Sequence, residues 1–361
     1  MNTGGKKTKV LIIHDMPLQT YRVYDYNELA DRGYEVTGGY FYDQERKMPV
    51  ELKFKPLPLY RKKILKFTYL TNFKDVNPDD YDVVIVAPNF WVLNFFKLYR
   101  KKYRNKVILW GHMKGHDHNS RIAGWYRDYL FKNYRSLVFY ESKTRDEFIK
   151  KGYKKENLFV ANNTQFVDNK NIDLDKERQD FVYVGRIQDR KRVDVALKAY
   201  KKVKEKSNDP NLRFLVVGGG NSDALKELVE KEQIKDVVFT GAIYDENELH
   251  KIFSTAIAYV SPGHVGLGVL QAIGHGVPVI TCEGQPHAPE VINCNEENSI
   301  MPPMTVEAVE AAMWKLYSDK ALQKKMSKAA YDYYNENCTI EIMIDGIEAA
   351  IKHLLKFNQD K

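Results

Sequence analysis

The amino-acid sequence predicts an α/β protein built from two doubly wound, Rossmann-like domains that face a cleft. Short apolar runs alternate with amphipathic helical patterns, and this alternation stops near the middle of the chain and then restarts. The 361 residues, of which 43% are hydrophobic, suffice for two cores of ordinary domain size. Ligands of such sheets bind beyond the carboxyl ends of the strands, so two facing domains would share one cleft.

The first series of elements contains apolar runs rich in β-branched or aromatic residues, which is typical of buried parallel strands. Amphipathic patterns between them predict helices over 20–33, where a glycine ends the pattern, and over 89–103. The segment after the first strand, LIIHDMPLQT, lacks the G-x-G-x-x-G turn and argues against a nicotinamide enzyme. The predicted strands are KVLIIHD (9–15), YDVVIVAP (81–88), KVILWG (106–111) and SLVFY (136–140).

The second series begins after a polar segment without periodicity, 162–180, which is the predicted domain junction. From Thr305 onward only helical patterns follow, and TIEIMIDGIEAAIKHLLKF (339–357) predicts a last helix whose apolar face crosses back onto the first domain. We therefore expect domains over 1–165 and 166–338, and a returning helix within 339–361. The predicted strands of the second series are FVYVGR (181–186), RFLVVGGG (213–220), VVFTGA (237–242), IAYVSP (257–262) and VPVITC (277–282).

Cysteine usage and hydropathy indicate a cytosolic protein. Its three cysteines, Cys282, Cys294 and Cys338, have no metal-type spacing, which favours a reducing compartment. The first apolar run breaks at His14-Asp15 and is too short for a signal peptide. No apolar run reaches the roughly 18 residues of a membrane span.

Positive charge is concentrated in the first half. Residues 1–170 hold 32 Lys and Arg against 19 Asp and Glu, a net of +13, whereas the remainder holds 24 against 29, a net of −5. The excess gathers in 52–70 and 96–106, where cations interleave with Phe, Tyr and Leu. Two interpretations stay open, a solvated basic face or adhesion to an anionic membrane surface. No recognised nucleic-acid-binding motif is present, so we expect no nucleic-acid partner.

A glycine-rich turn lies between a predicted strand and a predicted short helix in SPGHVGLGVLQAIGHGVPVI (261–280). A helix N-terminus carries unpaired N–H groups and partial positive charge. Gly266 and Gly268 would let a ligand approach that backbone closely, so the predicted occupant is an anion such as a phosphate or diphosphate. Close packing between helix and strand is the alternative reason for these glycines.

Two more strand ends strengthen the anion hypothesis. Arg186 and Lys191 lie five residues apart in VGRIQDRKRVD (184–194), after the first strand of the second series. An arginine forks onto phosphate oxygens and a lysine supplies a compact charge, whereas Arg190 and Arg192 are interpreted as solvated cations. The segment 216–228 is another strand–glycine–helix junction, so three such junctions would gather at one sheet edge.

The second half contains a series of motifs in a fixed order: FVYVGR…K, FLVVGGG, VVFTGAI, AYVSPG, VGLGVLQAIGHGVPVI, PE (289–290) and ENSIMPP (297–303). This series resembles the donor-binding half of family 4 GT-B glycosyltransferases. The first half resembles the family only in strand order and in WGHMKG (110–115). The resemblance implies a retaining enzyme that moves a sugar from a nucleotide-sugar donor to a glycan acceptor. The acceptor is expected to be lipid-linked, in cell-surface polysaccharide or lipopolysaccharide biosynthesis. The first domain would bind it at the inner face of the plasma membrane.

The resemblance also implies residue roles. Arg186 and Lys191 would grip the diphosphate and stabilise its charge, and His112 would approach the donor sugar, although it could simply cap a turn. The backbone at Ala242 and Ile243 would read the base edge. The diphosphate would sit on the amides of Gly266, Leu267, Gly268 and Val269. The remaining donor-binding residues expected from the resemblance are Gly185, Gly218, His264, Gln271 and Glu290.

One departure from the family pattern concerns two glutamates eight positions apart, because Gly263 and Gln271 stand in their places. Gln271 can still hydrogen-bond a ribose hydroxyl. Gly263 has no side chain, so His264, Glu283 or Glu290 must recognise the sugar instead.

We expect neither a metal nor a cofactor, because cationic side chains and a helix dipole can replace a metal ion. Asp80 and Asp82 form a D-x-D string, but it precedes an apolar run and is interpreted as structural. His116 and His118 have no carboxylate or cysteine nearby. The alternatives to a transferase are a non-catalytic sugar-nucleotide-binding protein and a GT-B-type sugar-nucleotide 2-epimerase. The missing acids at Gly263 and Gln271 argue against the epimerase.

Overall fold

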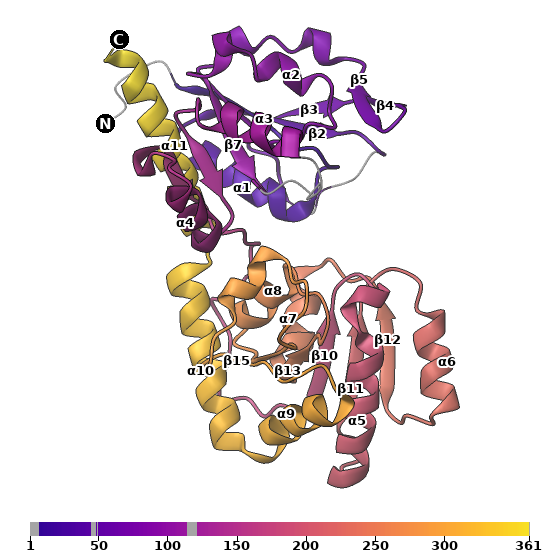
Figure 1. Ribbon diagram of the computed structural model, residues 1–361. Coiled ribbons are helices and arrows are strands. Elements are labelled where there is room, and N and C mark those ends of the chain that lie inside the picture. The colour runs from indigo at the N-terminus through magenta and orange to yellow at the C-terminus, as the bar shows by residue number, and fades with distance from the viewer. Residues whose placement is uncertain (1–6, 45–47, 49, 114–120, 361) are drawn as a thin grey trace. The chain divides into compact units, whose positions relative to one another are not determined.

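The computed structural model describes residues 7–44, 48, 50–113 and 121–360. The chain divides into two compact units, the first formed by Met1–Asn163 with Ile340–Lys361 and the second by Thr164–Thr339 (Figure 1). Each unit is an α/β domain around its own parallel sheet. This confirms the predicted fold class of two Rossmann-like domains.

The first unit contains a seven-stranded parallel sheet in the order β3-β2-β1-β6-β7-β8-β9. Its central strands β1, β6 and β7 are almost wholly apolar and buried, as strands covered on both faces must be. The strands are β1 (Lys9–Ile13), β2 (Glu35–Phe41), β3 (Lys55–Leu59), β6 (Val83–Val86), β7 (Val107–Gly111), β8 (Leu137–Phe139) and β9 (Leu158–Val160). The helices are α1 (Thr20–Asp31), α2 (Phe95–Leu98), α3 (Arg121–Phe131) and α4 (Ser142–Lys150), and 3₁₀ turns cover Phe73–Asp75, Pro78–Asp80, Lys101–Tyr103 and Lys155–Asn157.

The predicted helix over 89–103 is wrong. Only the single turn α2 and a 3₁₀ turn at Lys101–Tyr103 form there. The Asn89 side chain accepts the amide of Trp91 at 2.8 Å, and Thr68 pairs its backbone with Trp91 and Leu93. These bonds use the backbone groups that a helix would need, because an asparagine side chain competes with helical hydrogen bonding.

The basic stretch 52–70 forms the edge strand β3 and then an antiparallel hairpin of β4 (Arg61–Ile64) and β5 (Phe67–Leu70). Leu65 occupies the hairpin tip with a left-handed backbone (φ 55°), and 93% of its surface is exposed. Figure 1 shows this hairpin projecting from the body of the first unit.

The second unit contains a six-stranded parallel sheet in the order β12-β11-β10-β13-β14-β15. The strands are β10 (Asp180–Val184), β11 (Arg213–Val217), β12 (Val237–Gly241), β13 (Ala256–Val260), β14 (Val279–Ile280) and β15 (Ser299–Ile300). The helices are α5 (Val193–Ser207), α6 (Asp223–Lys231), α7 (Glu246–Ser254), α8 (Gly268–Gly274), α9 (Val306–Ser318) and α10 (Lys320–Asn337), with 3₁₀ turns at Asp189–Lys191 and Pro289–Asn293. The direction of strand order reverses between β10 and β13, where ligands of doubly wound sheets bind.

Helices cover both faces of this second sheet. On one face, α5 and α9 pack side by side over a core that includes Phe181, Leu197 and Met313 (Figure 1). On the other face, α8 packs against α10 over a core that includes Val269 and Tyr334. Because apolar packing holds both ends of α8, the glycine-rich turn that precedes it starts from a fixed support.

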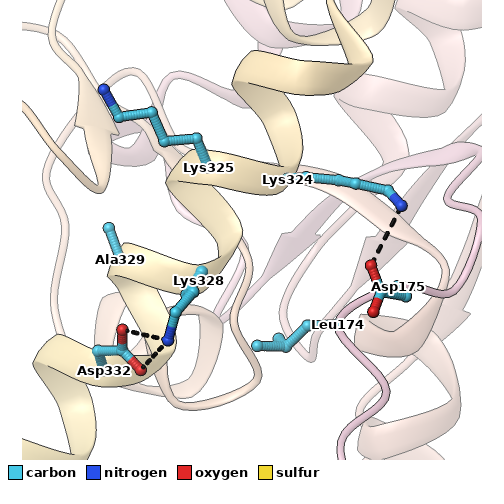
Figure 2. Close-up of a pocket in the computed structure, with 7 residues that line it drawn as sticks. All are labelled: Leu174, Asp175, Lys324, Lys325, Lys328, Ala329 and Asp332. Carbon is cyan, nitrogen blue, oxygen red and sulfur yellow. Dashed lines mark hydrogen bonds and ion pairs between the residues drawn. The ribbon is translucent and has the colours of Figure 1, made fainter.

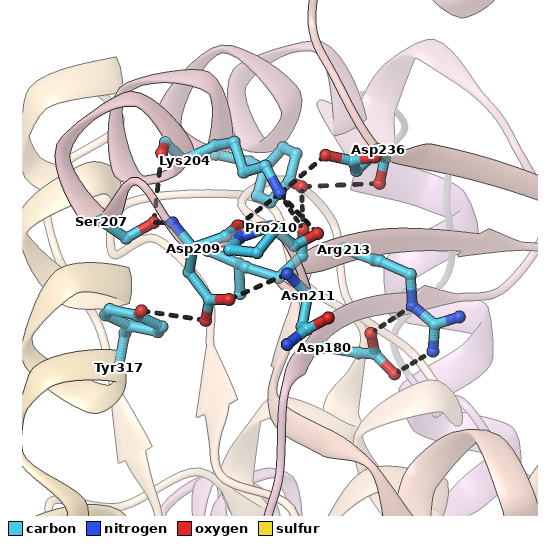
Figure 3. Close-up of polar contacts among 11 residues, drawn as sticks. Asp180, Lys204, Ser207, Asp209, Pro210, Asn211, Arg213, Asp236 and Tyr317 are labelled. Carbon is cyan, nitrogen blue, oxygen red and sulfur yellow. Dashed lines mark hydrogen bonds and ion pairs between the residues drawn. The ribbon is translucent and has the colours of Figure 1, made fainter.

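Paired charges stabilise the amino ends of these strands, as Figure 3 shows. The Arg213 guanidinium donates two hydrogen bonds of 2.8 Å to the buried Asp180 carboxylate, a bidentate ion pair. Lys204 donates to the carbonyl oxygens of Asp209 at 2.6 Å and Leu212 at 2.8 Å, and pairs with Asp236 at 2.7 Å. The charged groups at this edge therefore neutralise one another.

The last helix, α11 (Ile340–Gln359), belongs to the first unit. It contacts α1, β8 and β9, and it buries apolar side chains that include Ile347 and Ile351. Arg32 on α1 pairs with Asp345 at 2.6 Å and with Glu348 at 3.2 Å. Within the part of the chain that the structure describes, no helix has both the length and the apolar character needed to cross a bilayer.

Candidate functional site

The candidate site lies in the second unit at the carboxyl ends of β10, β11, β12 and β13. The four segments that follow these strands contain every predicted donor-binding residue except Glu290, which lies in the Pro289–Asn293 turn. All of these residues belong to one compact unit.

Backbone packing explains the predicted glycine at position 218. The Ile187 amide donates to the Gly219 carbonyl at 2.8 Å, which joins the segments after β10 and β11. A Cβ atom at Gly218 would lie 1.8 Å from the Gly185 carbonyl oxygen, so no side chain fits there. Packing thus accounts for Gly218, and its contact with a ligand stays a prediction.

The departure at Gly263 has a similar physical cause. The Gly263 amide donates to the Lys191 carbonyl at 3.0 Å, and the His264 amide donates to the Arg190 carbonyl at 2.8 Å. A Cβ atom at Gly263 would lie 2.2 Å from the Arg190 carbonyl oxygen. A glutamate cannot occupy this position, because the backbone after β10 fills the space.

Lys191 extends toward the glycine-rich turn. Its Nζ lies 3.9 Å from the point that a Cβ atom of Gly266 would occupy, so the glycine leaves room beside the ammonium group. Burial and, to a smaller extent, the charge of Arg190 lower the pKa of Lys191 to about 8, against the opposing effect of the buried Glu290. A half-buried cation next to a glycine turn is an arrangement that an anion would stabilise.

The other cations after β10 differ in their pairing. Arg186 is exposed, and within the described residues Arg186, Arg190 and Lys191 form no ion pair with a carboxylate. Arg190 and Arg192, both predicted to be solvated cations, therefore differ in their contacts. Arg192 pairs with Asp194 at 3.0 Å, whereas the Arg190 guanidinium lies 3.3 Å from Nε2 of His264. This edge carries uncompensated positive charge, unlike the amino ends of the same strands.

His264 is neutral in this surrounding. Burial lowers its pKa to about 4, and the neighbouring Lys191 and Arg190 add to the effect. Its Nδ1 atom is buried and has no hydrogen-bond partner among the described residues. The ring can therefore exchange a hydrogen bond with a ligand but cannot supply a positive charge.

The N-terminus of α8 offers three backbone donors. The amides of Gly266, Leu267 and Gly268 donate to no acceptor among the residues that the structure describes. The fourth predicted amide, that of Val269, donates to the Gly266 carbonyl at 3.0 Å, and its contact with a ligand stays a prediction.

A histidine that sequence reasoning missed holds this turn in place. Nδ1 of His287 accepts the Val265 amide at 3.2 Å, and Nε2 of His287 donates to the Cys282 carbonyl at 2.7 Å. In this arrangement the proton lies on Nε2, because Nδ1 faces an N–H group. The sequence gives no local pattern for this contact, since it joins segments more than 20 residues apart.

Gln271 is buried, and its amide is already hydrogen-bonded. Its Oε1 accepts from Nε2 of Gln165, and its Nε2 donates to Oε2 of Glu246 at 3.2 Å. Sequence reasoning missed both partners. Glu246 is only half-buried, and burial raises its pKa to about 7, with Asp168 and Asp245 adding to the effect and Gln271 opposing it. Ala242 is exposed and Ile243 half-buried on the segment that leads into this carboxylate.

Comparison with known proteins finds a family resemblance in the second unit. Residues 164–333 match the family model described as glycosyl transferases group 1, and the group 1 domain refers below to these matched residues. No curated protein matches the sequence.

Solved structures share the fold of the whole chain. S. aureus TarM, determined with fondaparinux, alpha-GlcNAc-glycerol and UDP, has 11% identity over 96% of this chain and 100% of its own, with a TM-score of 0.69. Anabaena HepE, determined with UDP and glucose, has 12% identity over 96% and 99%, with a TM-score of 0.69. The lipopolysaccharide outer core galactosyltransferase WaaB has 14% identity over 95% and 99%, with a TM-score of 0.63. The chain therefore has the GT-B fold.

His112 lies outside the group 1 domain. It follows β7 in the first unit, where its ring is exposed and meets the Tyr140 ring edge-on at 4.9 Å between centroids. The Tyr140 hydroxyl in turn lies 3.4 Å from the buried Arg22 guanidinium. The contact with a donor sugar that the resemblance implies for His112 stays a prediction.

Of the two metal motifs considered in the sequence, only the D-x-D string lies within the described residues. Asp82 accepts the Lys9 amide at 2.8 Å and Asp80 accepts from Asn77 at 2.9 Å, so both carboxylates of the D-x-D string serve local structure. His116 and His118 lie outside the described residues. Elsewhere in the described chain, no group of three or more His, Cys, Asp or Glu side chains is placed to hold a metal ion.

A hollow of about 510 Å³ lies beside α10, away from the predicted donor-binding residues of the group 1 domain. Figure 2 shows Lys324 extended toward Asp175, at 3.1 Å, and Lys328 paired with Asp332 on the same helix at 2.8 Å. Carboxylates neutralise both lysines, so this hollow offers less free charge than the edge with Arg186 and Lys191.

Proposed function

We propose that this protein is a glycosyltransferase that moves a sugar from a nucleotide-sugar donor, with retention of anomeric configuration, to a glycan acceptor. The observation that carries the proposal is that Lys191 reaches the turn whose Gly266–Gly268 amides have no acceptor among the described residues, in the domain that matches group 1. Arg186 and Arg190 lie on the same segment as Lys191, and none of the three forms an ion pair in the described chain. Such an edge fits a diphosphate. UDP accompanies both TarM and HepE, so a uridine diphosphate sugar is the first donor to test.

The proposed chemistry uses these groups to stabilise the leaving diphosphate. As the bond between the anomeric carbon and the phosphate oxygen breaks, negative charge moves onto the diphosphate. In this proposal Arg186 and protonated Lys191 stabilise that charge, and the partial burial of Lys191 strengthens its attraction. The acceptor hydroxyl attacks on the face from which the diphosphate departs and passes its proton to the departing phosphate oxygen. The configuration is thereby retained without a carboxylate nucleophile.

The remaining roles follow the resemblance. The backbone at Ala242 and Ile243 would contact the base, His112 the donor sugar, and His264 and Glu290 the groups near the diphosphate. Cationic side chains take the part that a divalent metal plays in other transferases, so we expect chelation by EDTA to leave transfer unchanged.

The acceptor is proposed to be a lipid-linked glycan in polysaccharide or lipopolysaccharide assembly, reached from the cytoplasmic face of an anionic membrane. The β4–β5 hairpin supports this. Its four cations, Arg61, Lys62, Lys63 and Lys66, form no ion pair within the described residues, and they flank the exposed Leu65. A merely solvated basic face needs no exposed leucine at its tip, whereas a membrane-docking surface combines both features.

An aromatic surface continues from the hairpin. Lys66 lies 4.7 Å from the Trp91 ring, and Phe90 next to it contacts Tyr126 on α3. Trp125 on the same helix is 68% exposed. Aromatic and basic side chains together are typical of surfaces that bind the membrane interface.

A thermal-shift screen with UDP, GDP and ADP, followed by assays for nucleoside diphosphate release from their sugars, tests the transferase proposal. We expect one nucleotide to raise the melting temperature and one donor to be hydrolysed slowly without acceptor. Binding without release would favour a non-catalytic binder, and a donor changed only at C2 would favour the epimerase. The absence of a shift with any nucleotide contradicts the proposal.

A further inference from the structure

Four polar or aromatic residues follow four neighbouring strands of the first sheet. Asp15 comes two residues after β1, Asn89 three residues after β6, His112 directly after β7 and Tyr140 directly after β8. These strands are parallel and adjacent in the order β1-β6-β7-β8, so all four residues lie at the carboxyl edge of the sheet. The direction of strand order reverses between β1 and β6, which is where doubly wound sheets bind ligands.

The Asp15 carboxylate is held in one orientation. Its Oδ2 accepts a hydrogen bond of 2.6 Å from Nδ2 of Asn89, and Oδ1 of Asn89 accepts the Trp91 amide at 2.8 Å. The Tyr99 hydroxyl donates to the Ala87 carbonyl at 3.0 Å, which fixes the segment that carries Asn89. Because the Asn89 amide is bonded at both ends, it orients Asp15, whose Oδ1 has no hydrogen-bond partner among the described residues.

The charge of Asp15 limits the ligands that this edge can take. Asp15 is half-buried, and it forms no ion pair in the described part of the chain. Asp25 on α1, by contrast, is fully buried and pairs with Arg22 at 2.7 Å. An uncompensated carboxylate repels phosphate, and the segment after β1 lacks the glycine turn that would hold one. The edge is therefore unsuited to a nucleotide or another anionic ligand.

The Tyr140 hydroxyl supplies a donor at the same edge. It lies 3.7 Å from the point that a Cβ atom of Gly111 would occupy, and Cδ of Pro88 lies 3.5 Å from that point. The hydroxyl thus reaches the end of β7, where the residue next to Asn89 also lies. Arg22 donates to its oxygen at 3.4 Å, and burial raises the pKa of Tyr140 to about 12 against the opposing charge of Arg22. The hydroxyl therefore keeps its own proton and can donate it.

An oriented carboxylate and a phenol donor beside an aromatic ring are suited to a sugar. A sugar hydroxyl donates to a carboxylate and accepts from a phenol, whereas an ammonium group only donates and a phosphate dianion only accepts. The charge of Asp15 contributes to the raised pKa of Tyr140, so the two groups lie within electrostatic reach of each other. Both are only half-buried, which leaves them accessible to a ligand.

We propose that the carboxyl edge of the first sheet binds an uncharged sugar, whose hydroxyls donate to Oδ1 of Asp15 and accept from the Tyr140 hydroxyl. The inference rests on the proposed function for the identity of this sugar, which we assign to the glycan acceptor. The unneutralised carboxylate makes the site select against uronic acids and other acidic sugars, because two carboxylates repel each other at short range.

NMR titration with the methyl glycosides of glucose, galactose and N-acetylglucosamine tests the inference. We expect the wild-type protein to bind at least one of them, and to bind the methyl uronosides of glucose and galactose about tenfold more weakly than the parent glycosides. Asp15→Asn should lower affinity for the neutral glycoside by about tenfold, the effect of losing a hydrogen bond to a charged group, and remove the discrimination against the uronoside. The matched control is Asp31→Asn at the other end of α1, where the carboxylate pairs with Lys53.

Tyr140→Phe gives an independent measurement if Asp15→Asn folds poorly. It keeps the ring and removes one neutral hydrogen bond, so affinity for the glycoside should fall by about threefold. The inference is overturned if none of the neutral glycosides binds, if the uronosides bind as tightly as the parent glycosides, or if both variants bind like the wild-type protein. UDP, GDP or ADP should raise the melting temperature of Asp15→Asn as in the wild-type protein, because the proposed nucleotide site lies in the second unit. Failure of the wild-type protein to bind any of these nucleotides contradicts the proposed function and leaves the result with the glycosides standing.

Discussion

The amide of Gly263 donates a 3.0 Å hydrogen bond to the carbonyl oxygen of Lys191, so the glycine-rich turn and the cationic segment after β10 form one structure. The place where relatives in the resembled family carry a glutamate is filled here by protein backbone. The two segments that would hold a diphosphate therefore position each other.

Substituting Gly263 tests this connection. In Gly263→Ala the new methyl group would meet the Arg190 carbonyl at 2.2 Å, which forces the two segments apart. We expect a loss of about 1–3 kcal/mol in the free energy of unfolding and a smaller thermal shift with nucleotide. Gly219→Ala is the matched control, because its methyl group would make only an ordinary 3.5 Å contact with Ala242. Equal stability of the two variants in chemical denaturation would contradict the expectation.

Lys191 should contribute to binding at a cost to stability. Replacement by methionine removes a half-buried cation with no ion pair in the described chain. We expect Lys191→Met to lose the nucleotide-induced thermal shift while the ligand-free protein keeps its stability or gains about 0.5–2 kcal/mol. The control is Lys202→Met, which removes an exposed lysine on α5 that pairs with Glu307 on α9. A variant that binds UDP normally would exclude Lys191 from the site.

The pKa of Lys191, lowered to about 8, predicts a pH dependence. Above pH 8 the free protein loses the Lys191 proton, so affinity for a nucleoside diphosphate should fall by up to about tenfold per pH unit. Between pH 8 and the ordinary lysine value the unfolded chain binds more protons than the folded one, and this group makes the ligand-free protein more stable as pH rises. Titrations from pH 7 to 10 measure the first effect. Lys191→Arg should remove it, because arginine stays charged. A profile that stays flat in the wild-type protein contradicts the assignment.

The hairpin predicts how the protein meets a membrane. Leu65→Glu and the pair Lys62→Glu with Lys63→Glu should each weaken co-sedimentation with vesicles that contain anionic lipid, and added salt should weaken binding of the wild-type protein. Each cation near the surface contributes about 1 kcal/mol, so the double charge reversal should cost at least tenfold in partitioning. Lys231→Glu on α6 of the second unit serves as the control. Binding that is absent, insensitive to salt, or unchanged in these variants removes the membrane proposal.

Sequence periodicity predicted the central strands of both sheets because each is a short apolar run covered on both faces. The same reasoning did not predict the elements at the edge of the first sheet. β3 has the sequence KPLPL, and its prolines and exposed lysine give no buried pattern. The 89–103 segment was predicted as a helix from its apolar spacing, but contacts with Thr68, distant in sequence, decided its backbone.

The candidate site was predictable where its chemistry is local. Arg186, Lys191 and the turn at Gly266–Gly268 each follow a strand within a few residues, so their common edge could be inferred. Glu246 and His287 could not be found this way, because their relevance depends on contacts with Gln271 and Val265 across the fold. The hydrogen bond of the Val269 amide to Gly266 could not be foreseen either, because the exact start of a helix determines which N–H groups remain unbonded.

The placement of α11 has a consequence for synthesis of the protein. The first unit is interrupted by the second and completed by the last helix, whose Ile347 and Ile351 cover β8, β9 and α1. The ribosome therefore synthesises the whole group 1 domain before it synthesises α11, the helix that completes the first unit. Until α11 is synthesised, apolar side chains along the first sheet stay exposed on the nascent chain, and chaperones can bind them.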